Sequence, residues 1–418
     1  MEIITLSNGL RVALEEMPHL RSVSVGVWVK AGSMLERPEE NGLSHFMEHM
    51  AFKGTARRSA RQIAEEMDAV GGQMNAATSK VCTNYYAKVI DEDLPLAMDL
   101  LSDIVIHPAL DKKEMDKERG VILEEIAMVE DSPEDVVYDV LAGAVYGSQS
   151  LGQTILGPGE KIAAYQPADL QAFRARHYGP KNAVVALAGH FDLKRIREQL
   201  ETYFGDWTGP EGEAFPVEEA VPAPAYLCRE KDTEQMHLCV GYRALPLGSP
   251  HVYRQAVMNG ILGGGMSSRL FQEVRERRGL CYSVYTYGAG HAETGVFAIY
   301  TALGKETEAQ ALETICRTIR DFAEHGPTAE ELDRARELSK ANVLMGLEST
   351  QSRMSALGRG TLLQDRPLTT DEVIEAYNAV TAEDVRALAR ELFDFSRVSL
   401  SAVGRVGDED YYRGLIEG

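Results

Sequence analysis

An internal duplication constrains the fold of this chain more than any other feature of its sequence. Segments from the start, the middle and the end of the first half recur in the second half at a nearly constant distance. The matching pairs are centred on Gly26 and Gly241, begin at Lys113 and Glu330, and end at Gly189 and Gly404, at offsets of 215, 217 and 215 residues. The 418 residues are therefore interpreted as two copies of one mixed domain of strands and helices. A repeat this long, present twice, excludes a solenoid.

The boundary between the two copies is predicted from composition. The stretch from Gly205 to Ala225 is rich in Pro, Gly and Glu and has no hydrophobic period, as is typical of a linker. We expect an N-terminal domain at 1–209, a linker at 210–225 and a homologous C-terminal domain at 226–418. Alternating apolar residues at 23–30 predict a strand, and the amphipathic stretches at 43–52 and 59–70 predict helices. Each domain is thus expected to be α+β.

The charge of the chain excludes several classes of partner. Its 43 basic and 64 acidic residues give a formal net charge of −21. Such a chain should repel nucleic acids and anionic membranes, because phosphate binding depends on Lys and Arg. The five cysteines are scattered without a Cys-x-x-Cys pair, which argues against disulfides and thiolate metal sites. With no visible signal peptide and no apolar run of about 18 residues, we expect a soluble, cytoplasmic protein.

The motif that indicates chemistry is His45-Phe-Met-Glu48-His49, in the first expected helix. Residues four apart lie on one face of a helix, so both imidazoles can reach one ion, and Glu48 stays beside it. Two imidazoles and a carboxylate form the ligand set of a catalytic zinc, with the fourth position left to water. His-x-x-Glu-His is the inverted zincin motif. The alternative is two ordinary helix histidines beside an unrelated glutamate.

A third protein ligand is required, because Glu48 is reserved for the water. Glu118 and Glu125 lie seven residues apart in a segment with a helical pattern, two turns along one face. Glu125 is predicted to be the carboxylate ligand, and Glu118 is predicted to accept the second N–H of a ligand histidine. The alternative is a solvated acidic helix face.

The duplication tests whether the fold itself needs these residues. In the second copy none of the five is retained. The positions that correspond to His45, Glu48, His49, Glu118 and Glu125 are Gly260, Gly263, Gly264, Ala335 and Asn342. The fold therefore does not demand them, which favours the functional interpretation.

HFMEH, ERGVILEE and the duplicated domain together resemble the pitrilysin family of inverted zinc metallopeptidases, and the length resembles its processing-peptidase subgroup with two homologous domains per chain. The resemblance implies a mainly antiparallel β-sheet covered by helices in each domain. It also implies one Zn²⁺ per chain and a homodimer.

The resemblance implies further site residues. Asn75 and Ala76 would lie on an edge strand that holds the main chain of an extended peptide. Arg275 and Tyr282 would bind the substrate carbonyl and stabilise the oxyanion. The alternative for the second pair is a surface arginine with a packed tyrosine.

We therefore expect a zinc endopeptidase that cleaves short or unfolded peptides. Residues 111–139 hold 11 acidic and 4 basic residues, which favours cationic peptides. The alternative is a non-catalytic peptide-binding subunit or chaperone of the same fold. A structural zinc site is disfavoured, because it would use four protein ligands.

Overall fold

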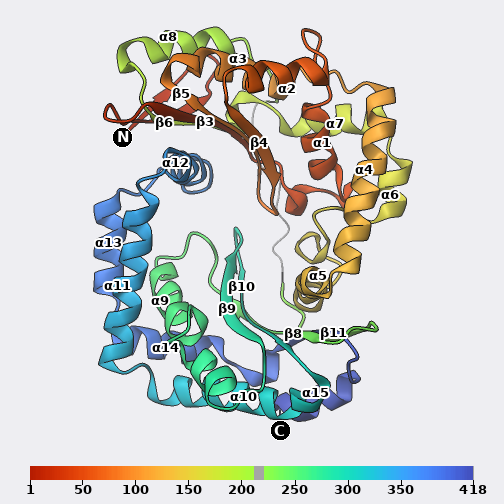
Figure 1. The fold of residues 1–418 in the computed structure, drawn as a ribbon, viewed down its shortest axis with the longest axis vertical. Helices are drawn as coiled ribbons and strands as arrows, with labels where there is room; N and C mark the ends of the chain where they lie inside the picture. Colours follow the sequence, from red (N-terminus) through yellow and green to blue (C-terminus); the bar gives the residue numbers. More distant parts are fainter. Residues whose placement is uncertain (211–220, 418) are drawn as a thin grey trace. The chain divides into compact units, whose positions relative to one another are not determined.

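The computed structural model describes residues 1–210 and 221–417 (Figure 1), and they form two compact units. Both units are discontinuous in sequence. The first combines 1–126, 154–210 and 345–368, and the second combines 127–153, 221–344 and 369–417. The linker predicted at 210–225 falls largely on 211–220, outside the described residues. The domain boundaries at 209 and 226 therefore stay a prediction about where the two sequence copies meet.

The first unit is built on a six-stranded sheet. Its strands are β1 (Glu2–Thr5), β2 (Arg11–Glu16), β3 (Ser22–Val29), β4 (Gln73–Thr78), β5 (Thr83–Ile90) and β6 (Ala183–Gly189). Their order is β1-β2-β6-β3-β5-β4, with β2 and β6 parallel and every other pair antiparallel. Among the described residues β4 pairs with β5 alone, so β4 is an edge strand.

The second unit repeats this arrangement without the first strand. Its strands are β7 (Tyr226–Glu230), β8 (Met236–Ala244), β9 (Ser283–Gly290), β10 (Gly295–Leu303) and β11 (Ser399–Gly404). Their order is β7-β11-β8-β10-β9, with one parallel pair, β7 and β11, in the corresponding place. The α+β class and the mainly antiparallel sheets are confirmed.

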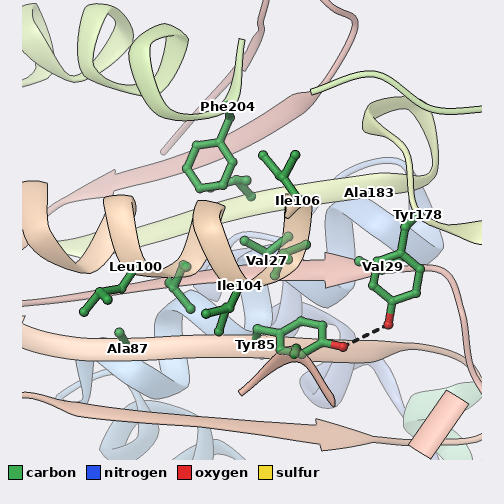
Figure 2. Packing of buried hydrophobic residues seen from close by; sticks show 14 of the residues in the cluster. Val27, Val29, Tyr85, Ala87, Leu100, Ile104, Ile106, Tyr178, Ala183 and Phe204 are labelled. Atoms are coloured by element: carbon green, nitrogen blue, oxygen red, sulfur yellow. Dashed lines mark hydrogen bonds between the residues drawn. The ribbon is translucent and has the colours of Figure 1, made fainter. Parts of the chain in front are cut away.

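One face of the first sheet is covered by α3 (Leu94–Ile106), with α8 (Leu193–Phe204) packed against that helix. Figure 2 shows Val27 of β3 and Leu100 of α3 within this core. The hydroxyls of Tyr85 and Tyr178 are buried there, and they satisfy each other with a hydrogen bond of 2.9 Å. Burial of such large side chains contributes roughly 1.5–3 kcal/mol each, which makes this face the main source of stability in the unit.

The opposite face of the first sheet is covered by α12 (Thr350–Gln364), a helix from the second half of the sequence. Trp28 of β3 packs there against Met354 and Leu357. The second sheet is covered in turn by α5 (Pro133–Tyr146), from the first half. Adding 217 to the residue numbers of α5 gives those of α12 to within one residue, so the two helices are equivalent in the two sequence copies. Each copy therefore supplies this helix to the sheet of the other copy. Each unit is therefore completed by the other half of the chain.

The remaining α-helices lie around these two sheets. They are α1 (Leu43–Ala51), α2 (Ala60–Ala69), α4 (Lys112–Asp131), α6 (Gly159–Ala164), α7 (Pro167–His177), α9 (Val252–Gly263), α10 (Glu308–His325), α11 (Ala329–Gly346), α13 (Thr370–Ala379), α14 (Ala382–Leu392) and α15 (Glu409–Glu417). A short π-helix, η6, spans Phe271–Glu276. Within the described ranges, none of the helices combines the length and the apolar content that a bilayer crossing needs.

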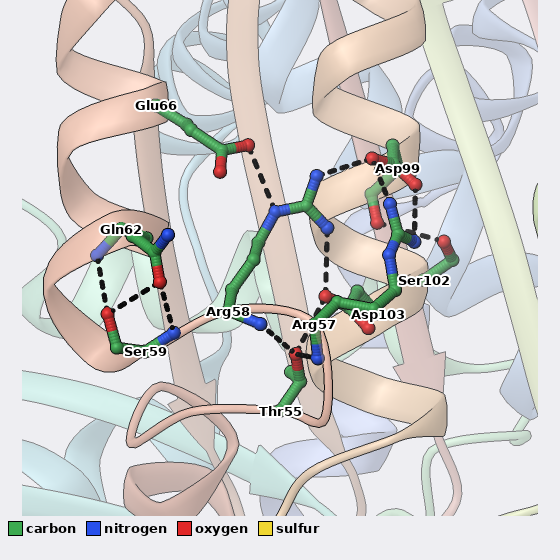
Figure 3. Close-up of polar contacts among 9 residues, drawn as sticks. All are labelled: Thr55, Arg57, Arg58, Ser59, Gln62, Glu66, Asp99, Ser102 and Asp103. Atoms are coloured by element: carbon green, nitrogen blue, oxygen red, sulfur yellow. Dashed lines mark hydrogen bonds and ion pairs between the residues drawn. The ribbon is translucent and has the colours of Figure 1, made fainter.

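A buried ion-pair network fastens the loop between α1 and α2 to α3 (Figure 3). The guanidinium of Arg58 contacts Glu66 at 2.9 Å, Asp99 at 2.5 Å and Asp103 at 2.8 Å. The side chain of Arg58 is 9% exposed and that of Asp103 is fully buried. Removal of one partner from such a network leaves uncompensated buried charge, which is far more costly than loss of a surface pair.

Substitution Arg58→Met is expected to destabilise the first unit by about 3–5 kcal/mol, because Asp99 and Asp103 lose their shared partner. Both tryptophans, Trp28 and Trp207, are buried in this unit, so denaturant unfolding followed by tryptophan fluorescence measures its stability. The matched control is Arg61→Met, at a side chain 84% exposed, for which a loss below about 1 kcal/mol is expected. Equal losses in the two variants would show that the network is not the anchor of this loop.

The ring of Trp28 also lies against two glycines. A Cβ at Gly358 of α12 would be 2.4 Å from the ring, and one at Gly26 would be 2.7 Å from it. Because the indole is rigid and 2% exposed, it cannot move aside. Close contact between α12 and the sheet therefore requires a residue without a side chain at position 358.

Substitution Gly358→Ala is expected to lower the stability of the first unit by roughly 1–3 kcal/mol through overpacking. The control is Gly120→Ala in α4, where a new Cβ meets nothing within 4 Å. That change should stabilise the protein by up to about 1 kcal/mol, because Ala favours a helix over Gly. Chemical unfolding of both variants measures the difference, and a neutral Gly358→Ala would rule out close packing of α12 on Trp28.

Candidate metal centre and active site

Helix α1 carries the His-x-x-Glu-His motif and is fixed by its apolar face. Phe46, Met47 and Met50 are buried in the core of the first unit. His45, Glu48 and His49 lie on the remaining face and are partly exposed. The apolar spacing therefore fixes the rotation of the helix and points the three polar side chains toward one region.

The start of α1 is held by Glu36, a residue that sequence reasoning missed. One carboxylate oxygen of Glu36 accepts the N–H of Ser44 at 2.6 Å, and the other accepts the N–H of Gly42 at 2.9 Å. These N–H groups belong to the first turn, where a helix has no internal acceptors for them. Burial raises the pKa of Glu36, and the hydrogen bonds to the carboxylate act in the opposite direction. This cap fixes the position of His45, which follows Ser44 directly.

The structure brings His45, His49 and Glu125 together. The two Nε2 atoms are 3.1 Å apart, and Glu125 Oε2 lies 3.6 Å from Nε2 of His45 and 3.4 Å from Nε2 of His49. Burial, aided by the charge of His49, lowers the pKa of His45 to about 4, so His45 is neutral near pH 7. Three donor atoms thus form a small triangle.

This triangle fits a zinc ion. Ligand bonds of about 2.0–2.1 Å in tetrahedral geometry place the donor atoms roughly 3.3–3.4 Å from one another, which agrees with the three separations. Two imidazoles and one carboxylate also leave one position open, as catalytic zinc sites do. Among the described residues, this is the one group of three or more His, Cys, Asp or Glu side chains close enough to hold a metal ion.

Glu118 lies in the predicted place behind His49. Its Oε1 is 2.8 Å from Nδ1 of His49, and its Oε2 is 2.7 Å from Nζ of Lys53. Since an ionised carboxylate can only accept, His49 donates through Nδ1, and the lone pair of the neutral ring is on Nε2. Burial would raise the pKa of Glu118, but the hydrogen bonds from His49 and Lys53 outweigh it and the pKa lies below its ordinary value. Glu118 therefore stays ionised and fixes the tautomer of His49.

Glu48 projects from the same helix face toward the end of β4. Its Oε2 accepts a hydrogen bond from the Thr78 hydroxyl. Burial raises the pKa of Glu48 above its ordinary value, while the hydrogen bonds from Thr78 act in the opposite direction. A carboxylate of raised basicity beside the donor triangle is suited to accept a proton.

Asn75 and Ala76 lie on the edge strand β4, as the resemblance implied. The N–H of Ala76 donates to Oδ1 of Asn75 at 2.8 Å. A cavity of about 630 Å³ adjoins this strand, and its lining includes Phe52, Met67, Asn75 and Lys88. An unpaired strand edge beside a cavity can bind an extended chain with one side chain inserted.

Arg275 and Tyr282 belong to the second unit, and the structure brings them together. The guanidinium carbon of Arg275 lies 5.4 Å from the centre of the Tyr282 ring and 4.8 Å from that of Phe271. Tyr282 is 70% exposed. These contacts are cation–π interactions at a surface, and they leave the tyrosine accessible.

Three residues of the site escaped prediction: Glu36, Lys53 and Thr78. Thr78 had a usable signal, because the alternation of β4 puts it on the same half-buried face as Met74 and Ala76. Lys53 lies two residues beyond the end of α1, and no sequence pattern assigns it a partner. Glu36 lies in a segment whose sequence has no period, so its cap could not be anticipated.

Two family models match consecutive parts of the chain. Residues 11–159 match the insulinase model of peptidase family M16, and residues 164–339 match the model of the M16 inactive domain. The uncharacterized zinc protease YmxG of Bacillus subtilis is 43% identical over 96% of this chain and 98% of its own length. An uncharacterized zinc protease of Streptomyces coelicolor is 39% identical over 98% of this chain and 90% of its own.

Solved structures share the fold. A protease from Helicobacter pylori has a TM-score of 0.91 at 22% identity, covering 96% of this chain and 99% of its own. An M16 inactive-domain protein from Pseudomonas fluorescens has a TM-score of 0.89 at 21% identity, covering 98% and 99%. The chain thus shares the fold of both solved structures. The chain belongs to peptidase family M16, and the resemblance to the pitrilysin family is confirmed.

Substitution Glu118→Gln is expected to weaken zinc binding about 10–100-fold, because the carboxylate that orients His49 loses its charge. Competition with a chromogenic chelator measures the affinity. Glu114→Gln, at a carboxylate of the same helix that pairs with Lys117, is the control and should leave the affinity unchanged. An unaltered affinity in Glu118→Gln would contradict the assigned role.

Proposed function

We propose that this chain is a zinc-dependent endopeptidase that hydrolyses peptide bonds in short or unfolded peptides. The observation that carries the proposal is the donor triangle of His45, His49 and Glu125, with the Glu48 carboxylate on the same helix face. A structural zinc site would have a fourth protein ligand, whereas this arrangement leaves a position for water beside a base. The names of the zinc protease relatives support the same class of reaction.

In the proposed reaction the metal activates the water and the substrate, and Glu48 transfers the proton. When bound, zinc supplies a Lewis acid that polarises the attacking water and the scissile carbonyl. Glu48 accepts the proton of the water and passes it to the leaving amine. Its raised pKa suits both steps, since the carboxylate must take the proton and then release it.

The edge strand β4 restricts the substrate to extended chains. Strand addition requires a main chain free to form hydrogen bonds, which folded proteins seldom expose. Asn75 and Ala76 are proposed to hold that main chain, and the apolar part of the neighbouring cavity to take one side chain. The excess of acidic residues at 111–139 would favour cationic peptides at low ionic strength.

The proposal keeps two roles that rest on the family resemblance. Arg275 and Tyr282 are assigned to the substrate carbonyl and the oxyanion, and their mutual contact supports action as one unit. We also propose a cytoplasmic homodimer with one Zn²⁺ per chain. The five free cysteines fit a reducing compartment.

Substitution Glu48→Gln is expected to lower turnover of a basic fluorogenic peptide by about 10²–10⁴-fold, because the general base is lost. Zinc content, measured by atomic emission, should remain that of the wild type. The control is Glu124→Gln, an exposed carboxylate next to Glu125, for which full turnover is expected.

Two results would overturn the proposal. Unchanged turnover in zinc-loaded Glu48→Gln would exclude Glu48 as the base. A zinc-free wild type that binds the peptide without cleaving it would instead favour a non-catalytic binding subunit.

A further inference from the structure

The orientation of the Glu48 carboxylate is not determined by its own helix. Helix α1 fixes the Cβ of Glu48, but three further torsions decide where the carboxylate lies, and a free glutamate side chain populates many of their combinations. The contacts that select one of them both come from Thr78, whose hydroxyl and main-chain N–H donate to the carboxylate. Thr78 is the last residue of β4, 30 positions further along the chain.

The neighbouring hydroxyl fixes the direction of this hydrogen bond. Thr83 Oγ1 lies 3.3 Å from Thr78 Oγ1 and donates its one proton to the carbonyl of Ala31 at 2.7 Å. The proton of Thr78 is therefore available to Glu48, and an ionised carboxylate is a stronger acceptor than a hydroxyl. Thr83 is fully buried, so this chain of hydrogen bonds is anchored in the core.

The packing of β4 does not by itself require a hydroxyl at position 78. Thr78 is half-buried on the strand face that also carries Met74 and Ala76, which pack against the core. A valine has nearly the same volume and an equal preference for a strand. The hydroxyl is thus explained by its partner, Glu48, better than by the fold.

The second sheet provides a comparison within the same chain. Counted along the paired strands from the matching Gly26 and Gly241, Thr78 corresponds to Gly290 and Thr83 corresponds to Gly295. At the offset of 215 residues, Glu48 corresponds to Gly263. The copy without the carboxylate therefore also lacks both hydroxyls, although its strands pair in the same register.

We propose that Thr78 is a positioning residue that couples the docking of a peptide on β4 to the orientation of Glu48. This inference rests on the proposed endopeptidase function. Ala76 and Thr78 are two residues apart on one strand, roughly 7 Å along its axis. A peptide that pairs with the edge of β4 straightens and orders the segment that holds the base. The Thr78 hydroxyl contacts Glu48 and Thr83, neither of which is assigned as a metal ligand.

Substitution Thr78→Val tests this inference, because it removes the hydroxyl and keeps the shape. With an extended fluorogenic peptide we expect kcat to fall about 10–100-fold, the value of one hydrogen bond to a charged group, and KM to change less than about twofold. Zinc content and melting temperature should match the wild type. Thr78→Ser retains the hydroxyl and should recover most of kcat. The control is Thr5→Val on β1, at the opposite edge of the sheet.

Three kinetic results would overturn the inference. An unchanged kcat in Thr78→Val would show that the hydroxyl does not position Glu48. A rise in KM alone would assign Thr78 to peptide binding. Equal losses in the Ser and Val variants would attribute the effect to strand structure.

A structural measurement separates this inference from the proposed function. A wild-type protein without turnover would refute the endopeptidase, and the inference would then depend on crystal structures of zinc-loaded wild type and Thr78→Val. A displaced or disordered Glu48 carboxylate in the variant supports the positioning role. A carboxylate in the same place in both structures overturns it.

Discussion

The close approach of two imidazole nitrogens is the constraint on which the rest of the site depends. Nε2 of His45 and Nε2 of His49 face each other at 3.1 Å. Nε2 of His49 presents a lone pair there, which either a proton on Nε2 of His45 or a bound cation can satisfy. Glu118 prevents the alternative tautomer of His49 by occupying Nδ1, and Lys53 holds Glu118 from behind. The protein thus uses an anion and a cation outside the triangle to keep its inner face ready for a positive ion.

The supports of this arrangement come from separate elements that converge on α1. Glu36 holds the first turn, the apolar face of Phe46 and Met50 fixes the rotation, and Thr78 of β4 reaches Glu48. The loop after α1 includes Lys53 near its start, bound to Glu118, and Arg58 near its end, bound to α3. Since both ends of this loop are anchored by ion pairs, Lys53 is held in place without belonging to a helix. The supports of the site are therefore hydrogen bonds and ion pairs contributed by several different segments of the first unit.

The metal triangle could be predicted from sequence because its spacing follows from helix geometry. Histidines four apart on α1 and glutamates seven apart on α4 each lie on one face, so the pattern contains the geometry. The supports could not be predicted in this way. Lys53 and Glu118 meet across 65 positions of sequence, and only the packing of α1 against α4 brings them together. The mainly antiparallel sheets were implied by the family resemblance, whereas the exchange of α5 and α12 between units was not anticipated. Because α5 and α12 are equivalent in the two sequence copies, their sequence patterns do not show which sheet each helix covers. That depends on close packing such as that of Gly358 on Trp28.

The duplicated fold leaves no room for a side chain at two glycines of the second copy that the comparison pairs with Glu48 and Thr83. At Gly263, which corresponds to Glu48, a Cβ would lie 2.3 Å from the main-chain nitrogen of Thr286 on β9. At Gly295, which corresponds to Thr83, a Cβ would lie 2.3 Å from the carbonyl oxygen of Leu245. Both obstacles are main-chain atoms, which cannot rotate away as a side chain can. In the first unit the residues at the matching sequence positions, Glu48 and Thr83, both carry side chains. The two copies therefore differ in backbone packing at these positions as well as in their polar residues.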